Sequence, residues 1–135
     1  MIYAVIDTNV LVSALITKNP EAATAQVVRL LLDNGFIPMY DADIIAEYKD
    51  VLHRPKFPIR PDVADSLISY IIEHGAEASR VNFDESMPDD DDRVFYEVTL
   101  SKEDSFLVTG NLKHYPVSPH VITPTQFIQV AALHE

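Results

Sequence analysis

Four consecutive aspartates form the densest charge in the sequence, and they precede a segment with helical spacing. They are Asp89, Asp90, Asp91 and Asp92, within "ESMPDDDDRVFYE" at 85–97. Neighbouring like charges repel, so a chain that needed only a solvated loop could use Ser or Asn instead. We interpret the run as part of a divalent cation site, because carboxylate oxygens are the ligands that Mg²⁺ and Mn²⁺ prefer.

Two other acids and one amide stand where they can join this run. Asp7 follows the short apolar run 3–6, which is typical of a strand buried on both faces. Glu47 lies at the border of an apolar stripe with helical spacing. Asn111 follows the strand-like segment 105–110. A cation held by such oxygens can activate water and neutralise a phosphodiester in the transition state.

Most other chemistry finds no support in the sequence. There is no cysteine, which excludes disulfides, thiolate metal sites and a cysteine nucleophile. The five histidines lack the spacing of a zinc site. With three glycines and no glycine-rich motif, a loop that cradles phosphate is not expected. Carboxylate, amide and hydroxyl oxygens therefore remain as the candidate metal ligands.

Strand-like and helix-like segments alternate along the chain. The expected strands are 3–6, 36–40, 76–81, 105–110 and 120–122; the expected helices are 7–16, 21–33, 42–53, 62–72, 94–100 and 123–135. This alternation predicts an α/β fold of three layers, with a parallel sheet of four to five strands between helices. In such sheets ligands bind beyond the carboxyl ends of the strands, where Asp7, Asn111 and the aspartate run would meet.

Length and composition are those of one globular domain spanning residues 1–135. The hydrophobic share of 47% supports a sizeable core, and no apolar stretch reaches the length of a membrane span. The first strand begins near Ile2, so we expect no signal peptide and a cytoplasmic location. The net charge of −11 argues against indiscriminate polyanion binding, although metal ions and a local basic patch can offset it.

Four segments together resemble the motifs of PIN-domain ribonucleases. They are "YAVIDTNVLVSAL" (3–15), "EYKDVLHRPKF" (47–57), "PDDDDRVFYEV" (88–98) and "FLVTGNLKHYP" (106–116). Each is weak by itself, but the four occur in order and at suitable distances over nearly the whole chain. The second segment is similar to the VapC-like branch of the family, the toxin components of toxin–antitoxin systems.

The resemblance implies a metal-dependent endoribonuclease whose acidic cluster binds Mg²⁺ or Mn²⁺. Asp7, Glu47 and Asp92 correspond to the catalytic metal ligands. The aspartate run leaves the register ambiguous, so Asp89 or Asp91 is a neighbour or an alternative ligand. Asn111 stands where the family often has a fourth carboxylate ligand. By the resemblance, we expect its amide oxygen to bind the metal directly or through water.

The same resemblance implies partners. The substrate would be RNA, and Arg54 and Lys56, with Arg60 nearby, would contact its phosphates. Thr8 and Asn9 would support the site by hydrogen bonding and contribute to substrate binding. A cognate antitoxin and a homo-oligomer are also expected.

Simpler interpretations exist for these residues. Asp7 can cap the helix that follows it, Glu47 can be an ordinary charge at a helix border, and Asn111 can be a turn residue. The aspartate run can be a solvated turn stabilised by a helix dipole, worth roughly 0.3–1 kcal/mol per side chain. The basic residues of 54–60 can serve solubility alone.

Two rival functions follow. One is a PIN-like module that binds nucleic acid or protein without catalysis. The other is a phosphotransfer domain of the haloacid dehalogenase type with Asp7 as nucleophile, although Asn9 stands where that family has aspartate.

Overall fold

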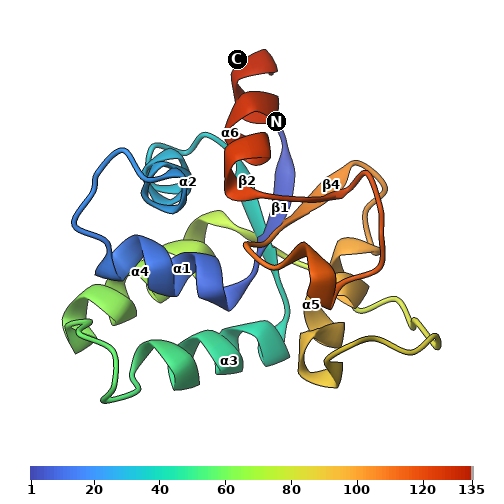
Figure 1. The fold of residues 1–135 in the computed structure, drawn as a ribbon, viewed down its shortest axis with the longest axis horizontal. Coiled ribbons are helices and arrows are strands. Elements are labelled where there is room, and N and C mark those ends of the chain that lie inside the picture. The colour runs from blue at the N-terminus through green and yellow to red at the C-terminus, as the bar shows by residue number, and fades with distance from the viewer. Residues whose placement is uncertain (135) are drawn as a thin grey trace.

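A five-stranded parallel sheet forms the centre of the computed structural model, which describes residues 1–134 (Figure 1). The strands are β1 (Tyr3–Ile6), β2 (Ile37–Tyr40), β3 (Ala76–Glu77), β4 (Ser105–Val108) and β5 (Val121–Ile122). The helices are α1 (Thr8–Ile16), α2 (Ala23–Leu32), α3 (Ala42–Leu52), α4 (Pro61–His74), α5 (Arg93–Thr99) and α6 (Pro124–Leu133). Two short 3₁₀ helices, η1 (Asp90–Asp92) and η2 (Leu112–His114), complete the fold. The expected three-layer α/β fold with four to five parallel strands is confirmed.

The strand order is β3-β2-β1-β4-β5, which places β1 in the middle. From β1 the chain winds outward through β2 and β3 in one direction, and through β4 and β5 in the other. In sheets with such a reversal, ligands usually bind beyond the carboxyl ends of the strands on either side of it, which here are β1 and β4. Ile6 pairs with Val108 at this edge, so the residues that follow β1 and β4 emerge side by side.

The helices cover both sides of the strands. α1 packs on α2, α2 packs on α6, and α3 packs on α4. α5 packs against β1, β2 and β4. Figure 1 shows both termini at the top, with β1 running down from there toward α1, α3 and α5. Within residues 1–134 no helix combines the length and apolar character needed to cross a bilayer.

Local sequence signals account for several helix boundaries. Asp41 Oδ1 accepts the Ile44 N–H at 2.8 Å and caps α3. Thr123 and Gln126 form a reciprocal capping box at α6, whose first residue is Pro124. Asn34, just past the end of α2, adopts φ of 59°, a left-handed conformation that asparagine tolerates well.

The strand expected at 76–81 is shorter than predicted. β3 pairs with β2 only through Met39 and Tyr40, so the missing N–H of Pro38 breaks no bond with β3. Beyond Ala78 the chain leaves the sheet, and the Val81 N–H donates to the carbonyl of Glu97 on α5. This loop then leads to the aspartate run.

Candidate active site

Asp7 lies at the centre of the carboxyl edge, directly after β1. Its side chain is buried, with a residue exposure of 3%, and its N–H donates to the carbonyl of Val108 at 3.0 Å. Oδ2 accepts hydrogen bonds from Thr109 Oγ1 at 2.8 Å and from the Tyr115 hydroxyl at 3.1 Å. Oδ1 accepts the Asn9 N–H at 3.3 Å, which caps α1. Capping and a place in the acidic cluster are therefore combined in one carboxylate.

Glu47 reaches this edge from α3. It is half-buried at the border of the apolar face, as its helical position predicts. The Thr8 hydroxyl donates to its Oε2 at 2.5 Å and ties the first residue of α1 to α3. The neighbouring Tyr48 donates its hydroxyl to the carbonyl of Ile6 at 2.5 Å, which anchors α3 to the end of β1.

Charges around Glu47 show which groups lie near it. Burial raises the pKa of Glu47, and the charges of Asp7 and Asp91 raise it further. The hydrogen bond from Thr8 and the charge of Arg54 oppose this rise. Glu47 therefore shares its electrostatic environment with Asp7, directly after β1, and with Asp91 of η1.

The first three aspartates of the run have separate environments. Asp89 caps η1 by accepting the Asp91 N–H at 3.0 Å. Asp90 is exposed and accepts two hydrogen bonds from the Arg93 guanidinium, at 2.9 and 2.8 Å. The same guanidinium donates to two carbonyls of the preceding loop, those of Phe83 and Glu85. Asp91 is exposed. The first two therefore build the turn.

Asp92 is the member of the run that faces the other acids. Its Oδ2 lies 3.0 Å from Nδ1 of His114, and its side chain is 15% exposed. Burial and the charges of Asp7 and Asp89 raise the pKa of Asp92 from 3.8 to about 6, against the opposing effect of His114. The charge of Asp7 thus acts on both Glu47 and Asp92, although the three acids come from distant segments of the chain.

The three acids do not form a complete metal-binding site in this structure. Within residues 1–134, no three His, Asp or Glu side chains converge tightly enough to hold a metal ion as they stand. In that part of the chain no protein donor contacts Glu47 Oε1 or Asp92 Oδ1. Glu47 and Asp92 therefore each have one hydrogen-bonded oxygen and a second oxygen without a protein donor, whereas both oxygens of Asp7 accept hydrogen bonds.

Asn111, Arg54 and Lys56 form no hydrogen bond with the three acids in residues 1–134. Asn111 is exposed, and its N–H donates to Thr109 Oγ1 at 3.0 Å. Arg54 forms an i,i+4 ion pair with Asp50 at 2.9 Å, and its charge also acts on Glu47. Lys56 lies over the ring of Phe57, 5.1 Å from its centroid.

Arg60 is paired as well, with Asp62 at 2.7 Å. The structure therefore does not gather Arg54, Lys56 and Arg60 into a cluster of unpaired cations, because acids beside two of them balance part of their charge. Arg54 alone is shown to act on one of the central acids.

Three residues that contact the acids are absent from the sequence-based expectations. They are Thr109, His114 and Tyr115, all in the segment that follows β4. The signal for them was weak but present, since a segment leaving a central parallel strand must pass this edge of the sheet. Thr, His and Tyr are also the residue types there that can donate to a carboxylate.

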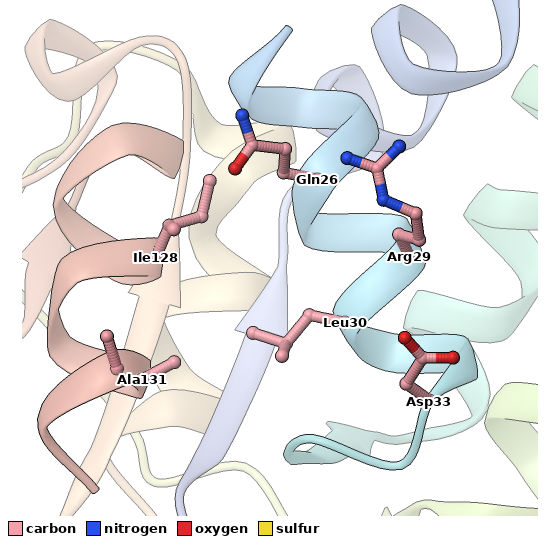
Figure 2. Close-up of a pocket in the computed structure, with 7 residues that line it drawn as sticks. Gln26, Arg29, Leu30, Asp33, Ile128 and Ala131 are labelled. Carbon is pink, nitrogen blue, oxygen red and sulfur yellow. The ribbon is translucent and has the colours of Figure 1, made fainter. Parts of the chain in front are cut away.

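A separate hollow lies between α2 and α6. Its volume is about 210 Å³, and Figure 2 shows Gln26, Arg29, Leu30 and Asp33 on one side of it and Ile128 and Ala131 on the other. None of the three central acids lines it. This hollow is therefore separate from the three central acids.

Comparison with known families agrees with this geometry. The profile of the PIN domain family matches residues 3–113, which include all three central acids. The chain belongs to the PIN domain family. Among curated proteins, no sequence matches this PIN domain significantly.

One solved structure is similar to this PIN domain in fold. Its title is "Crystal structure of VapBC2 from Rickettsia felis bound to a DNA fragment from their promoter". The TM-score is 0.55 and the sequence identity is 15%, over 90% of this chain and 97% of the other. At this identity the comparison shows a shared fold.

Proposed function

We propose that this PIN domain is a metal-dependent endoribonuclease. The observation that carries the proposal is the placement of Asp7, Glu47 and Asp92 at the carboxyl edge, where burial and the charges of nearby acids raise the pKa of the latter two. Like charges brought together at a cost in free energy favour a site that a cation completes. Membership of the PIN domain family supports the same activity.

The residues present fit Mg²⁺ or Mn²⁺. All the donor atoms are hard oxygens, and those of Glu47 and Asp92 that accept no protein hydrogen bond are available to a cation. Asp7, Glu47 and Asp92 would hold the ion, with the amide oxygen of Asn111 reaching it directly or through water. When bound, the ion supplies an activated water and positive charge for the phosphodiester. Asp89 and Asp91 add negative potential around the site.

The proposed substrate is RNA. Because the protein carries a net charge of −11, its contacts with phosphates have to be local. Arg54 is the best placed cation, since its charge already acts on Glu47, and Lys56 follows it in the same loop. Thr8 and Asn9, at the start of α1, would orient the acids and the nearby part of the substrate.

A cognate antitoxin is the proposed protein partner, by analogy with the VapBC2 complex that shares the fold. An apolar hollow of about 370 Å³ between α1, α2 and α4 suits such a partner. Leu15, Val28, Leu32, Val63 and Tyr70 are among its lining residues. We also expect a homo-oligomer, which light scattering would detect.

Metal-stripped protein incubated with labelled single-stranded RNA tests the activity. We expect no cleavage in EDTA and cleavage on adding Mn²⁺ or Mg²⁺. Cleavage that persists in excess chelator, in protein verified metal-free, would exclude the metal mechanism.

A weaker alternative is a PIN domain that binds nucleic acid or protein without cleaving. The observation in its favour is Asn111, an uncharged and exposed side chain where the family often has a carboxylate. Asn111→Asp separates the two. An active nuclease should cleave before the change and bind Mn²⁺ more tightly after it, whereas a non-cleaving module should gain cleavage only after the change, if at all.

A further inference from the structure

One oxygen of Asp7 is held by two hydroxyl groups from a single segment. Thr109 Oγ1 and the Tyr115 hydroxyl both donate to Oδ2, at 2.8 and 3.1 Å. Both donors are buried, with residue exposures of 0% for Thr109 and 4% for Tyr115. A carboxylate oxygen has two lone-pair directions, so these donors occupy Oδ2 fully. Only Oδ1, whose one partner is the Asn9 N–H at 3.3 Å, remains for a ligand.

We propose that Tyr115 is a positioning residue that, together with Thr109, makes Asp7 a ligand through Oδ1 alone. This inference rests on the proposed metal-dependent function and assigns a residue that the sequence-based site did not contain. Hydrogen bonds to the non-coordinating oxygen of a ligand fix its orientation and tune its affinity for metal.

The surroundings hold both hydroxyls as donors to Asp7. Thr109 Oγ1 accepts the Asn111 N–H at 3.0 Å, so its own hydrogen is directed toward Oδ2. The Tyr115 hydroxyl lies 3.1 Å from Oδ2, and because a carboxylate oxygen can only accept, the hydroxyl is the donor in this bond.

The position of Tyr115 in the chain restricts its movement. The residue follows η2, its N–H donates to the carbonyl of Leu112 at 3.2 Å, and its ring is in the core. The neighbouring His114 contacts Asp92. The segment 109–115 therefore orients two acids from distant parts of the chain. Thr109 and Tyr115 contact Asp7, and His114 contacts Asp92.

A purely structural role for the hydroxyl makes a different prediction from a positioning role. Loss of a buried hydrogen bond lowers the free energy of unfolding in either case. Only a positioning role changes the affinity of the folded protein for metal. Affinity measured well below the melting temperature therefore distinguishes the two.

The test is Mn²⁺ binding by calorimetry without RNA, comparing wild type, Tyr115→Phe and Tyr40→Phe. Tyr40 is the matched control, because its hydroxyl donates to a backbone carbonyl, that of Ile72, at 3.1 Å. We expect Tyr115→Phe to bind Mn²⁺ at least about tenfold more weakly, the usual scale for loss of such a partner. Tyr40→Phe should bind like wild type. In cleavage assays Tyr115→Phe should lower kcat and leave KM for RNA unchanged.

Two results would overturn the inference in different ways. Absence of Mn²⁺ binding in wild type would reject the metal-dependent function itself. Wild-type affinity in folded Tyr115→Phe would reject the positioning role alone. If Tyr115→Phe does not fold, Thr109→Val removes the other donor with little change in shape, and Thr109→Ser restores it. We then expect weak binding in the first and wild-type binding in the second, and equal affinity in both would contradict the inference.

Discussion

Nδ1 of His114 lies 3.0 Å from Oδ2 of Asp92, and this contact distinguishes Asp92 from its three acidic neighbours. Asp89 and Asp90 serve the turn, through the Asp91 N–H and the Arg93 guanidinium respectively. Members of the run therefore have different roles. The turn brings Asp92 near enough to Asp7 for the charge of Asp7 to raise the pKa of Asp92.

The first prediction compares two members of the run. Asp92→Asn should lower kcat/KM for RNA at least about 100-fold, because it removes a charged ligand, which corresponds to roughly 2.7 kcal/mol of transition-state stabilisation. Asp90→Asn is the matched control and should keep cleavage within a few-fold of wild type. Equal losses in the two variants would mean that the run acts only through its total charge.

A second prediction separates the site acids from a structural acid. Glu97 is 3% exposed and accepts hydrogen bonds from the Phe83 N–H at 2.7 Å and from Arg80 Nε at 2.8 Å. Although burial by itself raises its pKa, these donors outweigh burial and lower the pKa of Glu97. Glu97→Gln should reduce the free energy of unfolding by about 1–3 kcal/mol, since it weakens a buried charge-assisted network.

Urea unfolding in EDTA, combined with Mn²⁺ calorimetry on the folded variants, checks this contrast. Glu97→Gln should lose stability and keep metal binding, whereas Asp92→Asn should keep or gain stability and lose metal binding. The reverse pattern would show that the two acids have been assigned to the wrong roles.

The third prediction concerns pH in metal-free protein. The pKa of Asp92 is about 6 in the folded state, above its ordinary value of 3.8, and the pKa of Glu47 is also raised. Between these values the folded state binds more protons than the unfolded state, so this stabilising contribution is present at low pH and lost as pH rises through about 6. Asp92→Asn should therefore exceed wild type in melting temperature at pH 7.5 and lose part of that advantage at pH 5, because the wild-type contribution is complete only below about pH 3.8. A difference independent of pH would contradict the raised pKa.

The fourth prediction addresses the basic loop. Replacing Arg54 and Lys56 with Ala should weaken RNA binding and flatten its salt dependence, because fewer counterions are released. Arg60→Ala is the control, since Arg60 is paired with Asp62 and has no shown effect on the acids. An unchanged salt slope in the double variant would return Arg54 and Lys56 to a role in solubility.

Much of the fold was predictable because local signals agree with the global arrangement. The alternation of strand-like and helix-like segments and the position of Asp7 after a buried strand both pointed to one parallel sheet. The strand at 76–81 was overestimated because Val81 bonds to Glu97, a contact across the fold that periodicity does not report.

The acids themselves were readable from the sequence, but their supporting donors were not. The bond between Thr109 and Asp7 joins positions 102 residues apart and depends on the pairing of β1 with β4. Residues of this kind become visible only when the strand order is known. The division of labour among the aspartates likewise depends on the geometry of η1.

The most direct test of the central claim is Mn²⁺ binding to metal-stripped protein, measured by calorimetry on wild type, Asp7→Asn, Glu47→Gln and Asp92→Asn. We predict saturable binding to wild type and its loss in each variant, with circular dichroism showing that all four proteins remain folded. Absence of binding to wild type, or unchanged affinity in all three variants, would contradict the assignment of this edge of the sheet as a metal site.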